Sequence, residues 1–230
     1  MFFDPLYFLF VGPAFLLALL AQWRVKSAFA RWSQVPSASG LSGREVARRV
    51  LEHAGVTGVQ IEPSHGFLSD HYDPTKRTLR LSPANYDGTS IAAAAIAAHE
   101  AGHAIQHARA YAPLKLRSAA VPAATVGSSV SMVLLMAGMF LRSPHLILVG
   151  VVAFSAVVFF QLITLPVEFD ASRRAKLVLV DSGIVYLEED ERGVAKVLNA
   201  AAMTYVAAAI QSVLTLLYFL YRSGLIGGRR

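Results

Sequence analysis

The amino-acid sequence predicts a mainly α-helical integral membrane protein with four spans and a small cytoplasmic α+β cap. The first observation behind this prediction is composition: 55% of the 230 residues are hydrophobic, only 16% are charged, and the mean hydropathy is +0.49. This balance is too apolar for an ordinary soluble domain. The second observation is that four stretches have the length and low charge of bilayer spans: Pro5 to Gln22, Ala119 to Leu141, Leu146 to Val167 and Ala200 to Tyr221.

The third observation is the placement of the 21 Lys and Arg residues. Twelve lie between Arg24 and Arg117 and five lie between Arg173 and Lys196, which leaves four elsewhere in the chain. Because positive charge concentrates in cytoplasmic loops, we expect both long loops in the cytoplasm and both termini outside. With both termini outside, the three arginines after the fourth stretch lie on the disfavoured side: Arg222, Arg229 and Arg230.

We interpret the first apolar stretch as a retained anchor and not as a cleaved secretory signal. Its front end, MFFDPLYF, carries Asp4 and no positive charge, whereas Arg24, Lys26 and Arg31 follow the apolar part. A secretory signal has the opposite arrangement, with positive charge before its apolar part.

Composition also excludes several classes of site. The chain has no cysteine, so disulfides, thiolate zinc sites and a cysteine nucleophile are excluded. The net charge of +6 is explained by the concentration of Lys and Arg in cytoplasmic loops. The sequence contains no basic stripe with interleaved aromatic residues, so it does not indicate a nucleic-acid partner.

Short elements are predicted between the first and second spans. Residues 31–43, RWSQVPSASGLSG, have the Ser, Pro and Gly content of a linker. Ser42 and Glu45 form a capping-box pattern for a helix from Gly43 to about His53, with Val46, Val50 and Leu51 on one face. Strands are predicted at residues 58–63 and 78–82, with a turn at residues 73–74.

A further helix is predicted from about Ser90 to Ala108, with Thr89 or Ser90 as its N-cap. Two more helices are predicted between the third and fourth spans, separated near residues 181–183. The predicted division of the chain is an anchor (1–22), a cytoplasmic region with the Ser90 helix (23–118), a membrane hairpin (119–167), cytoplasmic helices (168–199) and a last span with its tail (200–230).

The predicted helix at Ser90 runs into AAIAAHEAGHAIQHARAY, residues 94–111. His99 and His103 are one helical turn apart, so both imidazoles project from one face and can bind the same metal ion. Glu100 is rotated about 100° from His99, which suits a general base acting on metal-bound water. This is the HExxH pattern of zinc peptidases. The alternative is a set of surface histidines on an alanine-rich helix. The small Ala101 and Gly102 leave room for a partner element to pack close beside this face.

A catalytic zinc site requires a third protein ligand. A histidine six residues after His103 would supply it in metzincins, but that position is Arg109. A carboxylate from a later helix is the remaining usual solution, and Glu168 is the best candidate. The alternative role for Glu168 is an interfacial glutamate paired with Arg173 or Arg174.

His107 competes with Glu168 because it lies four residues after His103. The rise of an α-helix separates His99 from His107 by about 12 Å, too far for both to bind one ion. His107 is therefore interpreted as a polar residue near the end of the helix.

The segments HYDP, LRLSPANYDG, AAHEAGHAIQ and LPVEFDASRRA, in this order within a four-span chain, resemble the YugP-type membrane zinc metallopeptidases. The resemblance covers nearly the whole chain. It implies a zincin-like cap, a gluzincin-like relationship to the HtpX and CAAX prenyl protease group, one Zn²⁺ per chain held by His99, His103 and Glu168, and Glu100 as catalytic base.

One position departs from the pattern of that wider group. Its third-ligand helix commonly reads Glu-x-x-x-Asp, and the aspartate supports a zinc histidine, whereas this chain has Ser172 in that position. Asp170 is expected on the opposite side of a regular helix from Glu168.

Two further roles are open from the sequence. The strand TLRLS, residues 78–82, is either an edge strand that pairs with an extended substrate or a strand that only packs the cap. An oxyanion also needs a donor beyond zinc, and His71, Tyr72 and Tyr205 are candidates, although a single His or Tyr is more often structural.

Together these patterns predict a membrane-bound zinc endopeptidase that cleaves membrane-proximal or unfolded proteins. Its partners are then a peptide or protein substrate and membrane lipid. The alternative is a non-catalytic membrane scaffold that retains a metal site, but such a scaffold does not need Glu100. An intramembrane protease would carry HExxH within a span, and the uncharged part of this helix is too short to be one.

Overall fold

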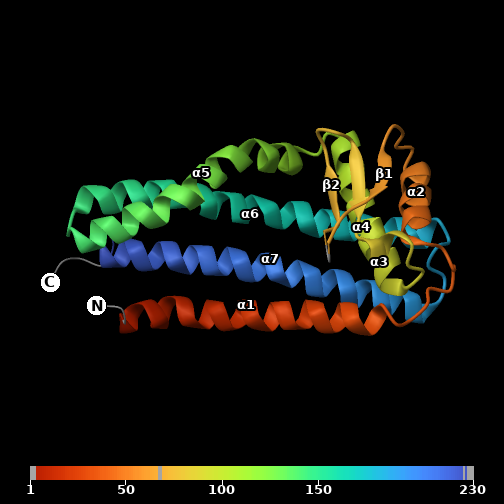
Figure 1. The fold of residues 1–230 in the computed structure, drawn as a ribbon, viewed down its shortest axis with the longest axis horizontal. Helices are drawn as coiled ribbons and strands as arrows, with labels where there is room; N and C mark the ends of the chain where they lie inside the picture. The colour runs from red at the N-terminus through yellow and green to blue at the C-terminus, as the bar shows by residue number, and fades with distance from the viewer. Residues whose placement is uncertain (1–3, 67–68, 225, 227–230) are drawn as a thin grey trace. The chain divides into compact units, whose positions relative to one another are not determined.

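The computed structural model describes residues 4–66, 69–224 and 226, and it is mainly α-helical with one small sheet (Figure 1). Arg229 and Arg230, and the two ends of the predicted division, lie outside the described residues. The chain forms two units. The first contains residues 1–21, 115–166 and 204–230, and the second contains residues 22–114 and 167–203.

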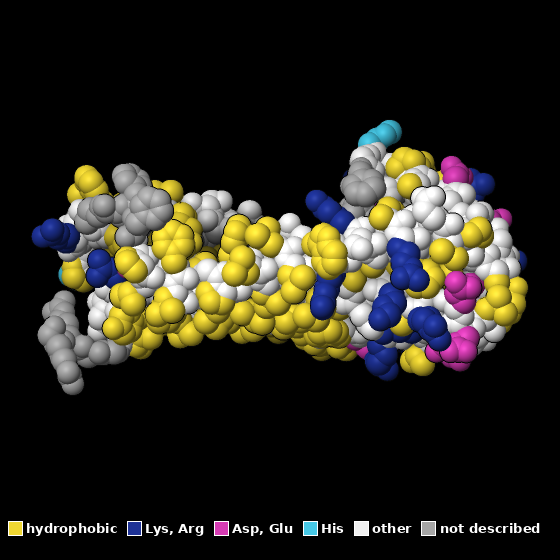
Figure 2. Space-filling model, turned by 90° about the horizontal axis from the view of Figure 1, so that it is seen from below, with side chains coloured by type: hydrophobic (Ala, Val, Ile, Leu, Met, Phe, Trp, Pro, Cys, Tyr) yellow, Lys and Arg dark blue, Asp and Glu magenta, His cyan; other side chains and the backbone are white. Residues whose placement is uncertain are grey.

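Among the described residues, four helices are long and apolar enough to cross a membrane, and they correspond to the four apolar stretches predicted from the sequence. They are α1 (Pro5–Trp32), α5 (Ala112–Phe140), α6 (Pro144–Asp181) and α7 (Glu188–Arg222). The first unit exposes large apolar side chains over most of its surface, for example Leu9 at 69% and Phe140 at 79%. Hydrophobic side chains cover this helical unit in Figure 2. Such exposure is costly in water and is expected in lipid.

The predicted cytoplasmic helices are not separate elements. The chain does break at residues 182–187, close to the predicted position, but α6 and α7 are each continuous with a span. No glycine or proline follows Pro166 in α6, so nothing ends the helix before Asp181. The acidic first turn of α7, Glu188 to Glu191, matches the positive end of its helix dipole.

The second unit contains the short elements. These are α2 (Gly43–His53), β1 (Gln60–Pro63), β2 (His71–Asp73), β3 (Thr78–Leu81), α3 (Pro83–Tyr86) and α4 (Ile91–Ala108). The predicted capping box is present at α2, where the Glu45 carboxylate accepts from the Ser42 backbone N–H at 2.8 Å. At α4 the Ser90 hydroxyl accepts from the backbone N–H of Ala93 at 3.2 Å, so Ser90 is the N-cap.

The sheet has the order β1-β3-β2, with β1 parallel and β2 antiparallel to β3. The central strand is therefore β3, which is hydrogen-bonded on both sides. The interpretation of residues 78–82 as a substrate-binding edge strand is wrong, because β1 and β2 already pair with both of its edges. The sequence of β3 is consistent with this position, since Leu79 and Leu81 are fully buried.

Alanine-rich α4 lies at the centre of the second unit. Its residues Ala92 to Ala95, Ala97, Ala98 and Ala101 have almost no exposed surface. The predicted apolar face of α2, formed by Val46, Val50 and Leu51, is buried in the same core. Methyl side chains let several elements approach one helix closely, which explains why a core helix consists mostly of alanine.

Candidate metal centre

The metal centre lies where α4 packs closely against α6. A Cβ atom at Gly102 would lie only 2.7 Å from the carbonyl oxygen of Ala171. Ala101, beside Gly102, is fully buried. The expectation that these small residues admit a close partner is therefore confirmed, and that partner is α6. This close approach brings side chains of the two helices within reach of one another.

The structure brings together the three side chains that the sequence predicted as ligands. Nε2 of His99 lies 3.2 Å from Oε2 of Glu168, and Nε2 of His103 lies 3.6 Å from the same oxygen. One ligand atom from each residue falls within 4.8 Å of the others. Atoms bound at about 2.0–2.2 Å to one tetrahedral zinc ion lie at comparable separations. Two imidazoles and one carboxylate are also the donor set of many catalytic zinc sites, so these residues fit zinc.

Each imidazole is held by a hydrogen bond at its other nitrogen. The hydroxyl of Ser172 lies 3.1 Å from Nδ1 of His99, and Oε1 of Gln106 lies 3.1 Å from Nδ1 of His103. Ser172, which stands in place of the aspartate of the Glu-x-x-x-Asp pattern, therefore still contacts His99. Hydrogen bonds of this kind orient a ligand and fix its tautomer.

The tautomer of His103 follows from the contacts of Gln106. The amide nitrogen of Gln106 donates to the carbonyl oxygen of Val167 at 2.8 Å and to the carboxylate of Asp170 at 2.9 Å. Because both partners can only accept, the amide oxygen of Gln106 must face Nδ1 of His103. Nδ1 is therefore the protonated nitrogen. In a neutral His103 the lone pair is on Nε2, which faces Glu168.

Asp170 contacts the metal-site residues indirectly, through Gln106. Asp170 was expected on the far side of its helix, but it is buried and accepts a hydrogen bond from Gln106 of α4. The same Gln106 amide nitrogen also donates to the carbonyl oxygen of Val167, so it links two residues of α6. Asp170 also pairs with Arg173 and Arg174, the two arginines considered as partners of Glu168.

The charges in and around the group of His99, His103 and Glu168 favour binding of a cation. Burial lowers the pKa of the His103 imidazole, but the hydrogen bond that His103 donates to the Glu168 carboxylate and the charge of Glu100 outweigh burial and raise that pKa above its ordinary value. The Glu168 side chain is only 3% exposed. Positive charge at this point is therefore stabilised by two nearby carboxylates, and a divalent ion bound there would benefit in the same way.

Glu100 lies next to the ligand group but is not part of it. It is buried, at 9% exposure, and its carboxylate makes no hydrogen bond or ion pair with any residue in the described ranges. Its charge nevertheless affects His103, so it is close to the group. Among the described residues only the Ser33 hydroxyl is a fully buried side-chain atom without a hydrogen-bond partner, so the Glu100 carboxylate reaches accessible space beside the ligand group, where a general base is needed.

His107 is not in the ligand group. Its Nδ1 lies 2.9 Å from the hydroxyl of Tyr72 on β2, so the two side chains form a pair one turn beyond His103. Among the other oxyanion candidates, His71 is exposed and donates from Nδ1 to the carbonyl oxygen of Ser69 at 2.8 Å. Tyr205 belongs to the first unit. An oxyanion role for any of the three stays a prediction.

Comparison with known proteins identifies relatives of the whole chain. A protein-family model described as "Putative neutral zinc metallopeptidase" matches residues 7–224. A curated relative, "Putative membrane protease YugP" of Bacillus subtilis (strain 168), is 50% identical over 213 residues, which are 92% of this chain and 94% of the relative. No solved structure matches the chain.

Proposed function

Because the chain belongs to the zinc metallopeptidase family whose model matches nearly its whole length, we propose that it is a membrane-bound zinc endopeptidase. One observation carries the proposal: the Nε2 atoms of His99 and His103 converge on Glu168, while the nearby carboxylate of Glu100 has no partner among the described residues. This arrangement supports a metal site with a base beside it. The membrane part of the proposal is supported by the four apolar helices.

The reaction is hydrolysis of a peptide bond. A zinc ion held by His99, His103 and Glu168 would polarise the scissile carbonyl and lower the pKa of a water molecule toward neutrality. Glu100 takes a proton from the attacking water and transfers it to the nitrogen of the leaving amine. The water oxygen forms the new bond to carbon as the carbon–nitrogen bond breaks. Gln106 and Ser172 keep the two imidazoles oriented throughout.

The proposed substrates are membrane-proximal or unfolded segments of proteins. The second unit provides only a small domain around α4, and Glu168 lies directly after the apolar part of α6, which ends at Val167. A site so close to a span favours chains near the membrane surface. The distribution of Lys and Arg supports the proposal that this site faces the cytoplasm. The proposed division of the chain into membrane and cytoplasmic segments is 1–22, 23–118, 119–167, 168–199 and 200–230. One zinc ion per chain and the relationship to the HtpX and CAAX group are part of the same proposal.

The test is proteolysis of casein by protein purified in detergent. We expect cleavage by the wild type, loss of cleavage after removal of metal by a chelator, and recovery with added zinc. Cleavage that is insensitive to the chelator would contradict zinc catalysis. A non-catalytic scaffold would bind zinc with the same residues and cleave nothing.

The Glu100→Gln variant separates the base from the ligands. It should retain one zinc ion and its thermal stability while the cleavage rate falls by at least about 100-fold, because the amide cannot accept the proton. Metal content and cleavage are measured on the same preparation. Loss of zinc together with activity would make Glu100 structural, and retained activity would remove it as the base.

A further inference from the structure

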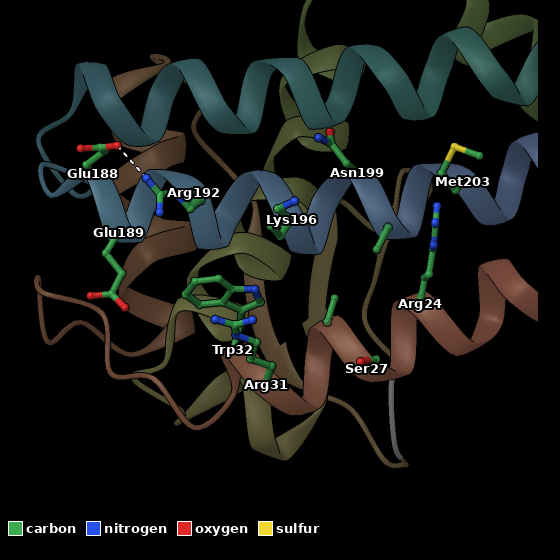
Figure 3. Close-up of a pocket in the computed structure, with 12 residues that line it drawn as sticks. Arg24, Ser27, Arg31, Trp32, Glu188, Glu189, Arg192, Lys196, Asn199 and Met203 are labelled. Carbon is green, nitrogen blue, oxygen red and sulfur yellow. Dashed lines mark hydrogen bonds and ion pairs between the residues drawn. The ribbon is translucent and has the colours of Figure 1, made fainter.

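A second candidate site lies between α1 and α7, in a pocket of ≈ 870 Å³ that contains none of the predicted metal ligands. Figure 3 shows the side chains that line it. All of them belong to the second unit. The volume is in the range of sites that bind small organic ligands.

The charge of the pocket is mainly positive. Four cations line it: Arg24, Arg31, Arg192 and Lys196. Arg192 is neutralised by Glu188 at 2.8 Å, and Glu189 is the other carboxylate in the lining. Within the described ranges, Arg24, Arg31 and Lys196 make no ion pair, and Arg31 instead lies over the Trp32 ring at 5.2 Å. An anion is therefore the expected ligand.

The predicted spans place the two cations nearest the apolar segments at the depth of lipid headgroups. Arg24 follows the last residue of the first apolar stretch by two residues, about 3 Å along a helix, and Lys196 precedes the fourth stretch by four residues, about 6 Å. The headgroup layer on each side of a bilayer is about 5–7 Å thick. Trp23 is 64% exposed at the same depth, as is typical of aromatic residues at a membrane interface.

One part of the pocket is apolar. Ala28 on α1 faces this space together with Ala200 and Met203 on α7, and in Figure 3 the Arg24 side chain extends from α1 toward Met203. A free phosphate ion gains nothing from such a wall. A phospholipid does, because its glycerol and first methylene groups lie beside the phosphate and bury apolar surface there.

We propose that this pocket binds the headgroup phosphate of an anionic glycerophospholipid. The guanidinium of Arg24 and the ammonium of Lys196 donate charge-assisted hydrogen bonds to the phosphodiester oxygens, and Arg31 adds positive charge farther from the membrane. Ala28, Ala200 and Met203 contact the glycerol. The proposal does not depend on proteolytic activity.

The experiment is native mass spectrometry of the full chain in detergent, titrated with phosphatidylglycerol or with phosphatidylcholine of the same acyl chains. We expect the wild type to bind one phosphatidylglycerol in preference to phosphatidylcholine. The double variant Arg24→Gln with Lys196→Gln should bind phosphatidylglycerol about tenfold or more weakly, because each cation contributes to attraction of the anionic lipid.

The matched control is Arg48→Gln with Arg49→Gln on exposed positions of α2, which removes the same charge outside the pocket. It should bind like the wild type. The pair Arg24→Lys with Lys196→Arg keeps both charges, so it should bind like the wild type even if the glutamine variant is unstable. Thermal unfolding of every variant is followed in parallel.

Three results would overturn the proposal. The first is equal binding of the two lipids by the wild type, and the second is equal weakening by the pocket variant and the α2 control. The third is displacement of phosphatidylglycerol by millimolar inorganic phosphate with the same dependence on Arg24 and Lys196, which would assign the pocket to free phosphate.

Discussion

At the scale of single residues, the two metal-site histidines are held in different ways. His99 contacts the hydroxyl of Ser172, a small group on the same helix as Glu168. His103 is held by an amide that is itself fixed by a buried carboxylate, that of Asp170. Ser172 stands where the Glu-x-x-x-Asp pattern has its aspartate, yet a carboxylate still acts on the site, through Gln106 and on the other histidine.

This difference leads to a prediction about zinc affinity. Ser172→Ala and Gln106→Met should each weaken zinc binding by about tenfold or more, because each removes the hydrogen bond that orients one imidazole. The control is Ser182→Ala near the end of α6, whose hydroxyl bonds only to carbonyl oxygens of its own helix. Zinc dissociation constants are measured by competition with a chromogenic chelator. Equal affinities for Ser172→Ala and Ser182→Ala would show that Ser172 does not position His99.

A second prediction concerns the third ligand. Glu168→Ala should weaken zinc binding by tenfold or more, the order expected for a lost ligand, whereas His107→Ala should leave it close to unchanged. The reason is geometric: Glu168 lies within 3.6 Å of Nε2 of both histidines, but His107 is paired with Tyr72. Zinc titration of both variants is the measurement. The reverse result would reject both the ligand assignment and the proposed function.

The sequence predicted the candidate site where one helical turn or the general requirement for a third zinc ligand was enough. His99, Glu100 and His103 follow from one helical turn, and Glu168 follows from the need for a carboxylate after a membrane hairpin. Gln106 was not predicted, because nothing on α4 indicates that its amide reaches Val167 and Asp170, more than 60 residues away. Its signal in the sequence was weak: one amide, three residues after a metal-ligand histidine, on an otherwise alanine-rich helix.

At the scale of elements, the sequence predicted the helices better than the arrangement of the strands. The start of α2 and the start of α4 follow from capping residues, and the structure has them at the predicted positions. The central place of β3 was not predictable, because the pairing of strands depends on contacts between distant segments and not on the strand itself. The continuity of α6 through the membrane boundary was also missed, since a change in polarity does not end a helix.

The contact of α4 with α6 gives an element-scale prediction. Gly102→Ala should destabilise the protein by about 1–3 kcal/mol and weaken zinc binding, because the added methyl meets the Ala171 carbonyl at 2.7 Å and pushes the helices apart. The control is Gly12→Ala in α1, a helical glycine with no atom within 4 Å of the added Cβ. Thermal unfolding in detergent measures both. A Gly102→Ala variant as stable as the control would show that α4 and α6 do not need this close approach.

At the scale of the whole molecule, the distribution of charge determines the expected orientation. Seventeen of the 21 Lys and Arg residues lie in the two long loops. In the expected orientation Arg222 would lie on the side where positive charge is disfavoured, but it pairs with Asp4 at 3.3 Å, and Asp4 also accepts from the Tyr218 hydroxyl at 2.9 Å. Asp4 thus offsets the charge of Arg222, which otherwise argues against four spans.

Orientation can be tested with single cysteines, because the chain has none of its own. The best probe positions are exposed ones: Thr57 in the first long loop, Glu189 in the second, and Leu141 between α5 and α6. Ser64 is less suitable because it is buried and contacts Ser69 at 2.6 Å. If both long loops are cytoplasmic, an impermeant thiol reagent should label Leu141→Cys in intact cells and should label Thr57→Cys and Glu189→Cys only after permeabilisation.

Labelling of Thr57→Cys in intact cells would reverse the topology and place the metal centre outside. Labelling of Thr57→Cys but not Glu189→Cys would be incompatible with four spans, because the hairpin of α5 and α6 must return the chain to the side it left.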